Sequence, residues 1–243
     1  YLFRSFVSFV PTFSIPYMNL MNGKRRTAIQ TARRKFSDGY AVIGKKIYFS
    51  ESCFEFMDFK YRLGYCSFLK VFDCENLTLK TLCRMPIAGS WVDFRMTALN
   101  GLLFVSGGLS NGNFSHSNVF QYSPNTNTWT EIKKMTVERC CHELVTLNGL
   151  IYAIGEYKTG QTVECYNPVT NEWNFVAPFR NVHFESYNWT ATSHQNKVYA
   201  FDTHKFKEFN PELNIWQELP FPHDKELGQL VSINDKLLFV GGY

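Results

Sequence analysis

The sequence predicts an all-β fold, a β-propeller of four-stranded antiparallel blades, on three observations. Aromatic residues make up 17% of the 243 residues, with 23 Phe and 13 Tyr, which favours pleated strands over helices. Two-residue turn signals recur between short apolar runs. An aromatic residue followed at a fixed distance by Trp recurs as well, and the units repeat every 43 to 56 residues. Such a repeat indicates blades around an axis rather than a single sandwich.

A two-residue turn marks the first hairpin of each unit, because Asn and Gly tolerate the positive φ of a tight turn. The turns are Gly44 with Lys45, Asn100 with Gly101, Asn148 with Gly149, Asn196 with Lys197, and Asn234 with Asp235. An apolar run follows each turn and predicts a strand buried on both faces. Three of these runs end in a glycine, at Gly107, Gly155 and Gly241, which suits a crowded strand end.

A second hairpin follows in each complete unit, where an aromatic residue precedes Trp by seven positions across a Pro- and Asn-containing turn. The pairs are Tyr122 with Trp129, Tyr166 with Trp173, and Phe209 with Trp216, and Phe72 with Leu79 is a degraded copy. Two hairpins give four antiparallel strands for each unit. The repeated aromatic columns can be buried only against the same columns of the next unit, which predicts stacked sheets.

The repeat resembles the kelch motif over about residues 33–243. The third unit carries nearly every feature of that motif. These features are Met135, Arg139, Asn148, Gly149, Tyr152, Gly155, Tyr166, Asn167, Pro168, Thr170, Asn171 and Trp173. The first unit lacks both glycines and the Trp, and the fourth has Asp202 and Thr203 in place of glycines, so unusual loops are expected there. The Gly-His and Trp-Asp columns of the alternative WD40 repeat are absent.

The unit boundaries predict an N-terminal segment, 1–32, that is a linker or the remnant of a preceding region, and a propeller over 33–243. Complete blades are expected at about 33–86, 87–135, 136–178 and 179–222, with a partial fifth blade at 223–243. Kelch propellers usually have six blades, and the chain begins with Tyr1, so the sequence is expected to be a fragment. In an alternative closure, residues 3–21 supply the outer strands of the last blade.

Charge and hydropathy exclude several classes of protein. The net charge is +4, and six of the 25 Lys and Arg residues cluster within 24–35, so no nucleic-acid-binding surface is predicted. No apolar stretch is long enough for a membrane helix. The seven cysteines show no zinc-binding spacing, and we expect reduced thiols and a cytoplasmic protein.

No catalytic residue, metal site or cofactor is expected. The six histidines occupy unlike positions in different units, and no sialidase-type motif is present. The neighbouring cysteines Cys140 and Cys141 lie between Arg139 and His142. Nearby positive charge would lower a thiol pKa and create a redox sensor. The alternative is that both thiols pack inside the blade.

The candidate site is a column of large cationic or aromatic residues nine positions before the turn, where each innermost strand begins. Its members are Lys35, Trp91, Arg139, Tyr187 and Lys225. Arg, Trp and Tyr are favoured at interface hot spots. Asn111, Asn113, His116 and Lys158, in the loops after the glycines, are further candidates. The alternative is that the column anchors the blade entrance, with Arg139 bonded to a carbonyl group.

The resemblance implies a protein-interaction domain that binds a partner segment with acidic or aromatic residues. In kelch-like adaptors, upstream BTB and BACK regions connect such a domain to a cullin-RING ubiquitin ligase, and that upstream region is not part of this sequence. An actin-binding or F-box-linked scaffold is the alternative. A secreted propeller enzyme is a third possibility, and an upstream signal peptide would distinguish it.

Overall fold

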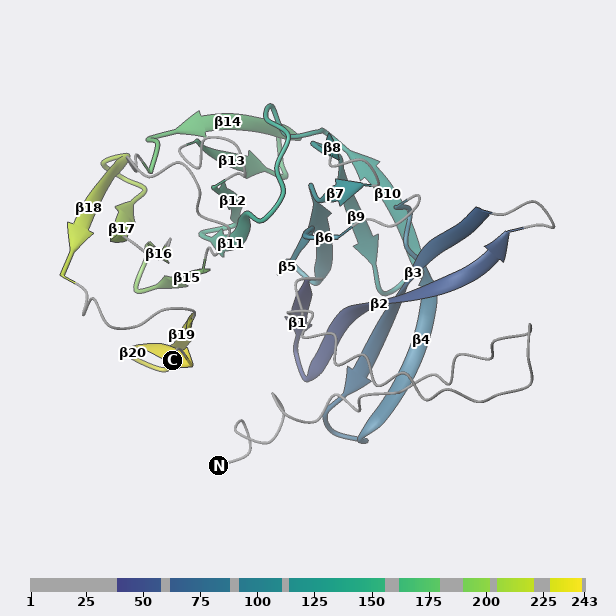
Figure 1. Cartoon of the computed structure of the whole chain (residues 1–243). Coiled ribbons are helices and arrows are strands. Elements are labelled where there is room, and N and C mark those ends of the chain that lie inside the picture. Colours follow the sequence, from purple (N-terminus) through teal and green to yellow (C-terminus); the bar gives the residue numbers. More distant parts are fainter. Residues whose placement is uncertain are drawn as a thin grey trace, which may run out of the picture. The chain divides into compact units, whose positions relative to one another are not determined.

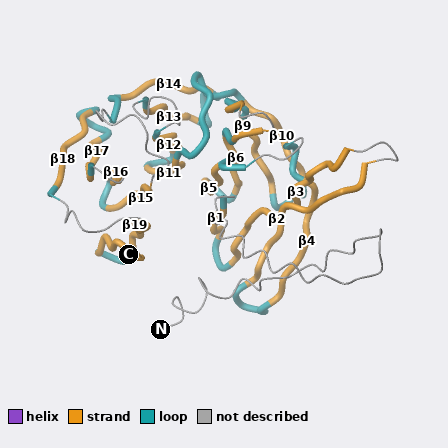
Figure 2. Tube along the Cα trace, viewed as in Figure 1, coloured by secondary structure: helices purple, strands orange, loops and turns teal. Residues whose placement is uncertain are grey.

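The computed structural model describes residues 39–57, 62–87, 92–110, 114–155, 162–179, 190–201, 205–220 and 228–241. The chain divides into the units Tyr1–Lys35 and Phe36–Tyr243, and every described residue lies in the second. All regular elements of this described part are strands, as Figure 2 shows. It contains no helix of the length and hydropathy needed to cross a membrane. The predicted all-β fold is confirmed.

In the described part, four sheets have four antiparallel strands each, and two smaller sheets have two strands each (Figure 1). Blade 1 comprises β1 (Tyr40–Ile43), β2 (Lys46–Met57), β3 (Arg62–Asp73) and β4 (Thr78–Arg84). Blade 2 comprises β5 (Arg95–Leu99), β6 (Leu102–Ser106), β9 (Val119–Ser123) and β10 (Thr128–Ile132). Blade 3 comprises β11 (Glu143–Leu147), β12 (Leu150–Ile154), β13 (Val163–Asn167) and β14 (Glu172–Val176).

Blade 4 comprises β15 (Thr190–His194), β16 (Lys197–Phe201), β17 (Phe206–Asn210) and β18 (Ile215–Leu219). The half blade 5 contains β19 (Gly228–Ile233) and β20 (Lys236–Gly241). A small extra hairpin, β7 (Leu109–Ser110) and β8 (Phe114–Ser115), lies between β6 and β9. The first strand of each blade contacts the first strand of the next, from β1 through β5, β11 and β15 to β19. These first strands are therefore the inner strands, as a propeller requires.

The strand register confirms the predicted second hairpins. Each Trp lies directly opposite its aromatic partner, as Tyr166 does opposite Trp173. Four of the five first turns also fall where they were predicted. The turn of blade 4 does not, because His194 pairs with Lys197 and the turn residues are Gln195 and Asn196, both with positive φ. The prediction was one residue too late because Gln195 is not a typical residue for such a turn.

Blade 1 differs from the others in its second and third strands. β2 and β3 have 12 residues each and pair along their whole length, from Lys46 opposite Asp73 to Met57 opposite Arg62. Figure 1 shows them extending past the other strands of the blade as a two-stranded ribbon. Blades 2 and 3 carry Gly107 and Gly155, with positive φ, at the position where this ribbon continues with Glu51. The missing glycine explains why the strand does not end there.

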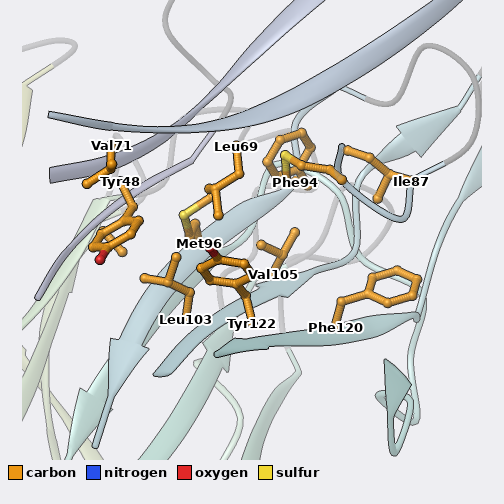
Figure 3. Packing of buried hydrophobic residues seen from close by; sticks show 12 residues of the cluster. Tyr48, Leu69, Val71, Ile87, Phe94, Met96, Leu103, Val105, Phe120 and Tyr122 are labelled. Carbon is orange, nitrogen blue, oxygen red and sulfur yellow. The ribbon is translucent and has the colours of Figure 1, made fainter. Parts of the chain in front are cut away.

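The core lies between the blades. Blade 1 contributes Tyr48, Leu69 and Val71 to one cluster, and they face Leu103 and Tyr122 of blade 2 in Figure 3. Two further clusters lie between blades 2 and 3 and between blades 3 and 4. Each sheet therefore buries its apolar columns against the next sheet, as the repeat predicts.

In blades 3 and 4, the Asn-x-Trp segment also joins the outer strand to the preceding blade. The indole Nε1 of Trp173 donates to the carbonyl oxygen of Lys133 at 3.0 Å, and the amide of Lys133 donates to Oδ1 of Asn171 at 3.3 Å. Trp216 and Asn214 make the same pair of bonds to Ala177, at 2.8 Å each. A single residue at the end of the preceding blade is thus held by both its amide and its carbonyl group.

Blade 2 makes this contact with a different acceptor. The indole Nε1 of Trp129 donates to Sγ of Cys83 at 3.2 Å. Burial raises the pKa of the Cys83 thiol, so the acceptor is a neutral sulfur, which accepts hydrogen bonds weakly.

Candidate functional site

The inner strands of all five blades line a central cavity of about 400 Å³. At one end, Nε of Arg95 donates to Oε1 of Glu143 at 3.2 Å. Burial raises the pKa of Glu143, and the Arg95 charge opposes this rise. Blades 5 and 1 meet through Nε2 of Gln229, which donates to the hydroxyl of Tyr40 at 3.2 Å. The cavity therefore has a polar rim at the end where the inner strands begin.

One of the five predicted site residues lies in the described part of the chain. Lys35, Trp91, Tyr187 and Lys225 lie outside it, as do the loop candidates Asn111, Asn113 and Lys158 and the glycine replacements Asp202 and Thr203. Because the turn of blade 4 begins at Gln195, the position nine residues before it is Ser186 rather than Tyr187. The roles of the candidate residues outside the described part remain predictions.

Arg139 is fully buried, at 0% exposure. Its guanidinium donates to Glu164, to the carbonyl oxygens of Gly155 and Thr162, and to the Thr162 hydroxyl. These five bonds use all five N–H donors of the side chain. A side chain without exposed surface or a spare donor does not contact a partner, so Arg139 fits the anchoring alternative and not partner contact.

The backbone of Arg139 joins the entrance of blade 3 to the loop of blade 2. The Gly108 amide donates to the Arg139 carbonyl at 2.8 Å, the Arg139 amide donates to the His116 carbonyl at 2.9 Å, and the His116 amide donates to the Gly108 carbonyl at 3.0 Å. The three bonds form a closed ring. The entrance of blade 3 at Arg139 and the base of the blade 2 loop therefore lie on the same face, which we call the entrance face.

The extra hairpin of blade 2 adds an exposed aromatic side chain to this face. Phe114, in β8, is 69% exposed, although the neighbouring Ser115 is buried. Ser115 is adjacent to His116, which belongs to the ring of backbone bonds. The sequence analysis missed Phe114 because the hairpin is an insertion found in the second unit and belongs to no repeated column.

Cys140, Cys141 and His142 follow Arg139 and pack between blades 2 and 3. Cys140 is buried and accepts a bond from the Ser115 hydroxyl at 3.5 Å. The pKa of Cys141 is raised, mainly by a hydrogen bond with Cys140 and secondly by burial. This shift is opposite to the one a thiol sensor needs, so the packing alternative describes these cysteines better.

His142 is a buried counterpart of an apolar residue. It lies six positions before its turn, where blade 2 has the fully buried Phe94. Its Nε2 lies 2.8 Å from the Ser106 hydroxyl, and burial holds its pKa well below the ordinary 6.5, with Arg95 and Arg139 adding to the shift. The imidazole is neutral and part of the packing between the blades. Within the described ranges, no group of three or more His, Cys, Asp or Glu side chains is placed to hold a metal ion.

Comparisons with known proteins agree with this geometry. A family model described as the Kelch motif matches residues 90–136, which correspond to the second blade. Human Kelch-like protein 6 is 34% identical over 113 residues, covering 45% of this chain and 17% of that protein. Mouse Kelch-like protein 35 is 28% identical over 163 residues, covering 62% and 27%. Human Kelch-like protein 23 is 28% identical over 164 residues, covering 61% and 29%.

The chain thus spans less than a third of the length of these relatives. Among solved structures, the one described as "Structure of YjhT" matches with a TM-score of 0.64 and 15% identity, over 85% of this chain and 72% of that one. At this identity the likeness concerns the fold. Together with the repeated turn, glycine and Trp columns, these matches show that the chain is a kelch-repeat β-propeller.

Proposed function

We propose that this chain is a protein-binding domain that takes its partner on the entrance face, and that it is the substrate-recognition module of a cullin-RING ubiquitin ligase adaptor. The ring of backbone bonds through Arg139 carries the proposal, because it holds the entrance of blade 3 and the loop of the preceding blade together. A continuous surface of loops mounted on rigid strands is suited to binding. The similarity to kelch-like proteins supports a binding role rather than a catalytic one.

The contact residues in this proposal are Lys35, Trp91 and Lys225 of the column and Tyr187, which follows the column position of blade 4 by one residue, with Phe114 added and Arg139 removed. Aromatic and lysine side chains in such positions favour a partner segment with acidic or aromatic residues. The proposed adaptor is cytoplasmic, and its link to the cullin lies in an upstream region outside this sequence.

The test compares capture of partners by the full chain and by variants of the entrance face. Wild-type protein, the double variant Lys35→Glu with Lys225→Glu, and Phe114→Ala are immobilised, and bound proteins from a cell lysate are quantified by mass spectrometry. Lys236→Glu is the matched control, because this exposed lysine follows the turn at the other end of the β19–β20 hairpin. We expect the face variants to lose the same set of proteins at an unchanged Tm.

Equal capture by the wild type and both face variants would contradict the proposed face. The adaptor role is tested separately with the full-length protein. Co-purification of a cullin supports it, whereas co-purification of actin filaments without a cullin supports the scaffold function instead.

A further inference from the structure

Arg139 connects two neighbouring loops, one through its backbone and the other through its side chain. On the blade 2 side, its carbonyl and amide groups bond with Gly108 and His116, at 2.8 and 2.9 Å. These two residues flank the β7–β8 hairpin that leads from β6 to β9. The base of the blade 2 loop is therefore fixed to the backbone of Arg139.

On the blade 3 side, the guanidinium spans the connection between β12 and β13. Nη1 donates to the Gly155 carbonyl at 2.7 Å and to the Thr162 carbonyl at 3.0 Å, and Nη2 donates to the Thr162 hydroxyl at 2.9 Å. Gly155 directly follows β12, and Thr162 directly precedes β13. A single planar group therefore holds both ends of this loop.

Glu164 fixes the guanidinium in place. Its Oε1 accepts from Arg139 at 2.9 Å and from the Val137 amide at 3.1 Å, and its Oε2 accepts from the Thr136 amide at 2.6 Å. Both charged side chains are completely buried. In a dry site with every donor used, the guanidinium cannot shift without breaking a bond or moving its own backbone.

We propose that Arg139 is a positioning residue that couples the loop of blade 3 to the loop of blade 2. A displacement at Gly155 or Thr162, such as the one a bound partner would cause, is transmitted through the guanidinium to the ring formed by Gly108, Arg139 and His116. The two loops then respond as one unit. The link of this coupling to partner binding rests on the proposed function, whereas the coupling itself does not.

Blade 4 has no such arginine bonded to the residue at the strand position of Glu164. Lys207 replaces Glu164 there, and its Nζ donates to the Phe179 carbonyl and lies 4.6 Å from the centre of the Phe179 ring. Lys207 thus anchors the segment that leads into its blade, as Glu164 anchors Thr136 and Val137. Its replacement provides a matched control for loss of a buried charge.

The test is amide hydrogen exchange of the full chain without a partner, resolved residue by residue by NMR. The readouts are the amides of Gly108, Arg139 and His116, which lie in the ring. Thr162→Val and Glu164→Gln alter the partners of Arg139 in blade 3 but keep Arg139 itself, and Arg139→Met removes all its side-chain donors. We expect the three amides to exchange faster in the order Thr162→Val, Glu164→Gln, Arg139→Met, by about tenfold in Glu164→Gln.

Specificity is judged from amides elsewhere. In the blade 3 variants, the amides within β16 should exchange as in the wild type. In Lys207→Met, all three ring amides should exchange as in the wild type. Arg139→Lys keeps the charge without the planar fork and should restore only part of the protection. Wild-type exchange of the ring amides in folded Glu164→Gln and Thr162→Val protein would overturn the coupling. If the entrance face captures no partner, but the ring amides exchange faster in the blade 3 variants, the proposed function is overturned and the coupling stands.

Discussion

The Trp contacts between blades give a sharp prediction, because two of them have different acceptors. Trp129 and Trp216 are both half-buried. The ring of Trp129 lies 5.0 Å from that of Tyr122, and the ring of Trp216 lies 5.1 Å from those of Phe209 and Phe179. Trp216 donates to the Ala177 carbonyl, and Trp129 donates to the Cys83 sulfur. Replacement of each by Phe removes the donor and a similar apolar area.

The expected difference follows from what the lost donor leaves behind. A buried carbonyl without its partner costs about 1–3 kcal/mol, and the low end applies at a half-buried site. A weak thiol acceptor accounts for less than about 0.5 kcal/mol. Trp216→Phe should therefore lower the free energy of unfolding by about 1 kcal/mol more than Trp129→Phe, which corresponds to about 2–4 °C in Tm.

Urea unfolding followed by circular dichroism measures this difference directly. Trp173→Phe provides a second carbonyl case, since its acceptor is the Lys133 carbonyl, and it should also cost more than Trp129→Phe. A loss in Trp129→Phe equal to or larger than the loss in Trp216→Phe would refute the reasoning, because the acceptor would then make no difference.

Three further predictions concern the junction of blades 2 and 3. Gly107→Ala should lower the free energy of unfolding by more than about 2 kcal/mol, because φ is +61° and the new Cβ would lie 2.3 Å from the Arg139 carbonyl oxygen. Gly149→Ala, at φ +78° with open space around the new Cβ, should lower it by only about 1 kcal/mol. Equal losses in thermal unfolding would contradict the close contact. The buried, neutral His142 binds a proton only when the chain unfolds, so the free energy of unfolding should fall as the pH drops below 6.5, by up to about 1.4 kcal/mol per pH unit from this group. His142→Phe should remove that share of the slope, and identical slopes between pH 6.5 and 5 would show that His142 is protonated in the folded state. Finally, Cys140 and Cys141 should react slowly with iodoacetamide at neutral pH until denaturant is added, whereas the exposed Cys74 should react at once; equally fast labelling of Cys141 would revive the sensor hypothesis.

The repeated features of the fold were predictable from the sequence because each has a local cause. Asn148 and Gly149 adopt positive φ in a two-residue turn, and Tyr166 and Trp173 are opposite each other across a hairpin. Gln195 shows the limit of this approach. It adopts positive φ without being a typical turn residue, and the predicted turn was shifted by one position as a result.

The role of Arg139 could not be predicted from its column. Its counter-ion Glu164 lies 25 residues later, at a position where blade 4 has Lys207 and blade 2 has Phe120. A contact between two positions that do not repeat has no periodic signal. One clue was present, since Glu164 is a charged residue inside an otherwise apolar strand, where a carboxylate needs a partner.

The direction of the Trp and Asn contacts has a consequence for synthesis on the ribosome. Trp173 and Asn171 bond to Lys133, and Trp216 and Asn214 bond to Ala177, so each blade attaches to a residue that has already been translated. A blade that leaves the exit tunnel therefore finds its docking point on a sheet that has had time to form. Assembly can proceed from the N-terminal end, one blade at a time, without waiting for the chain to be completed.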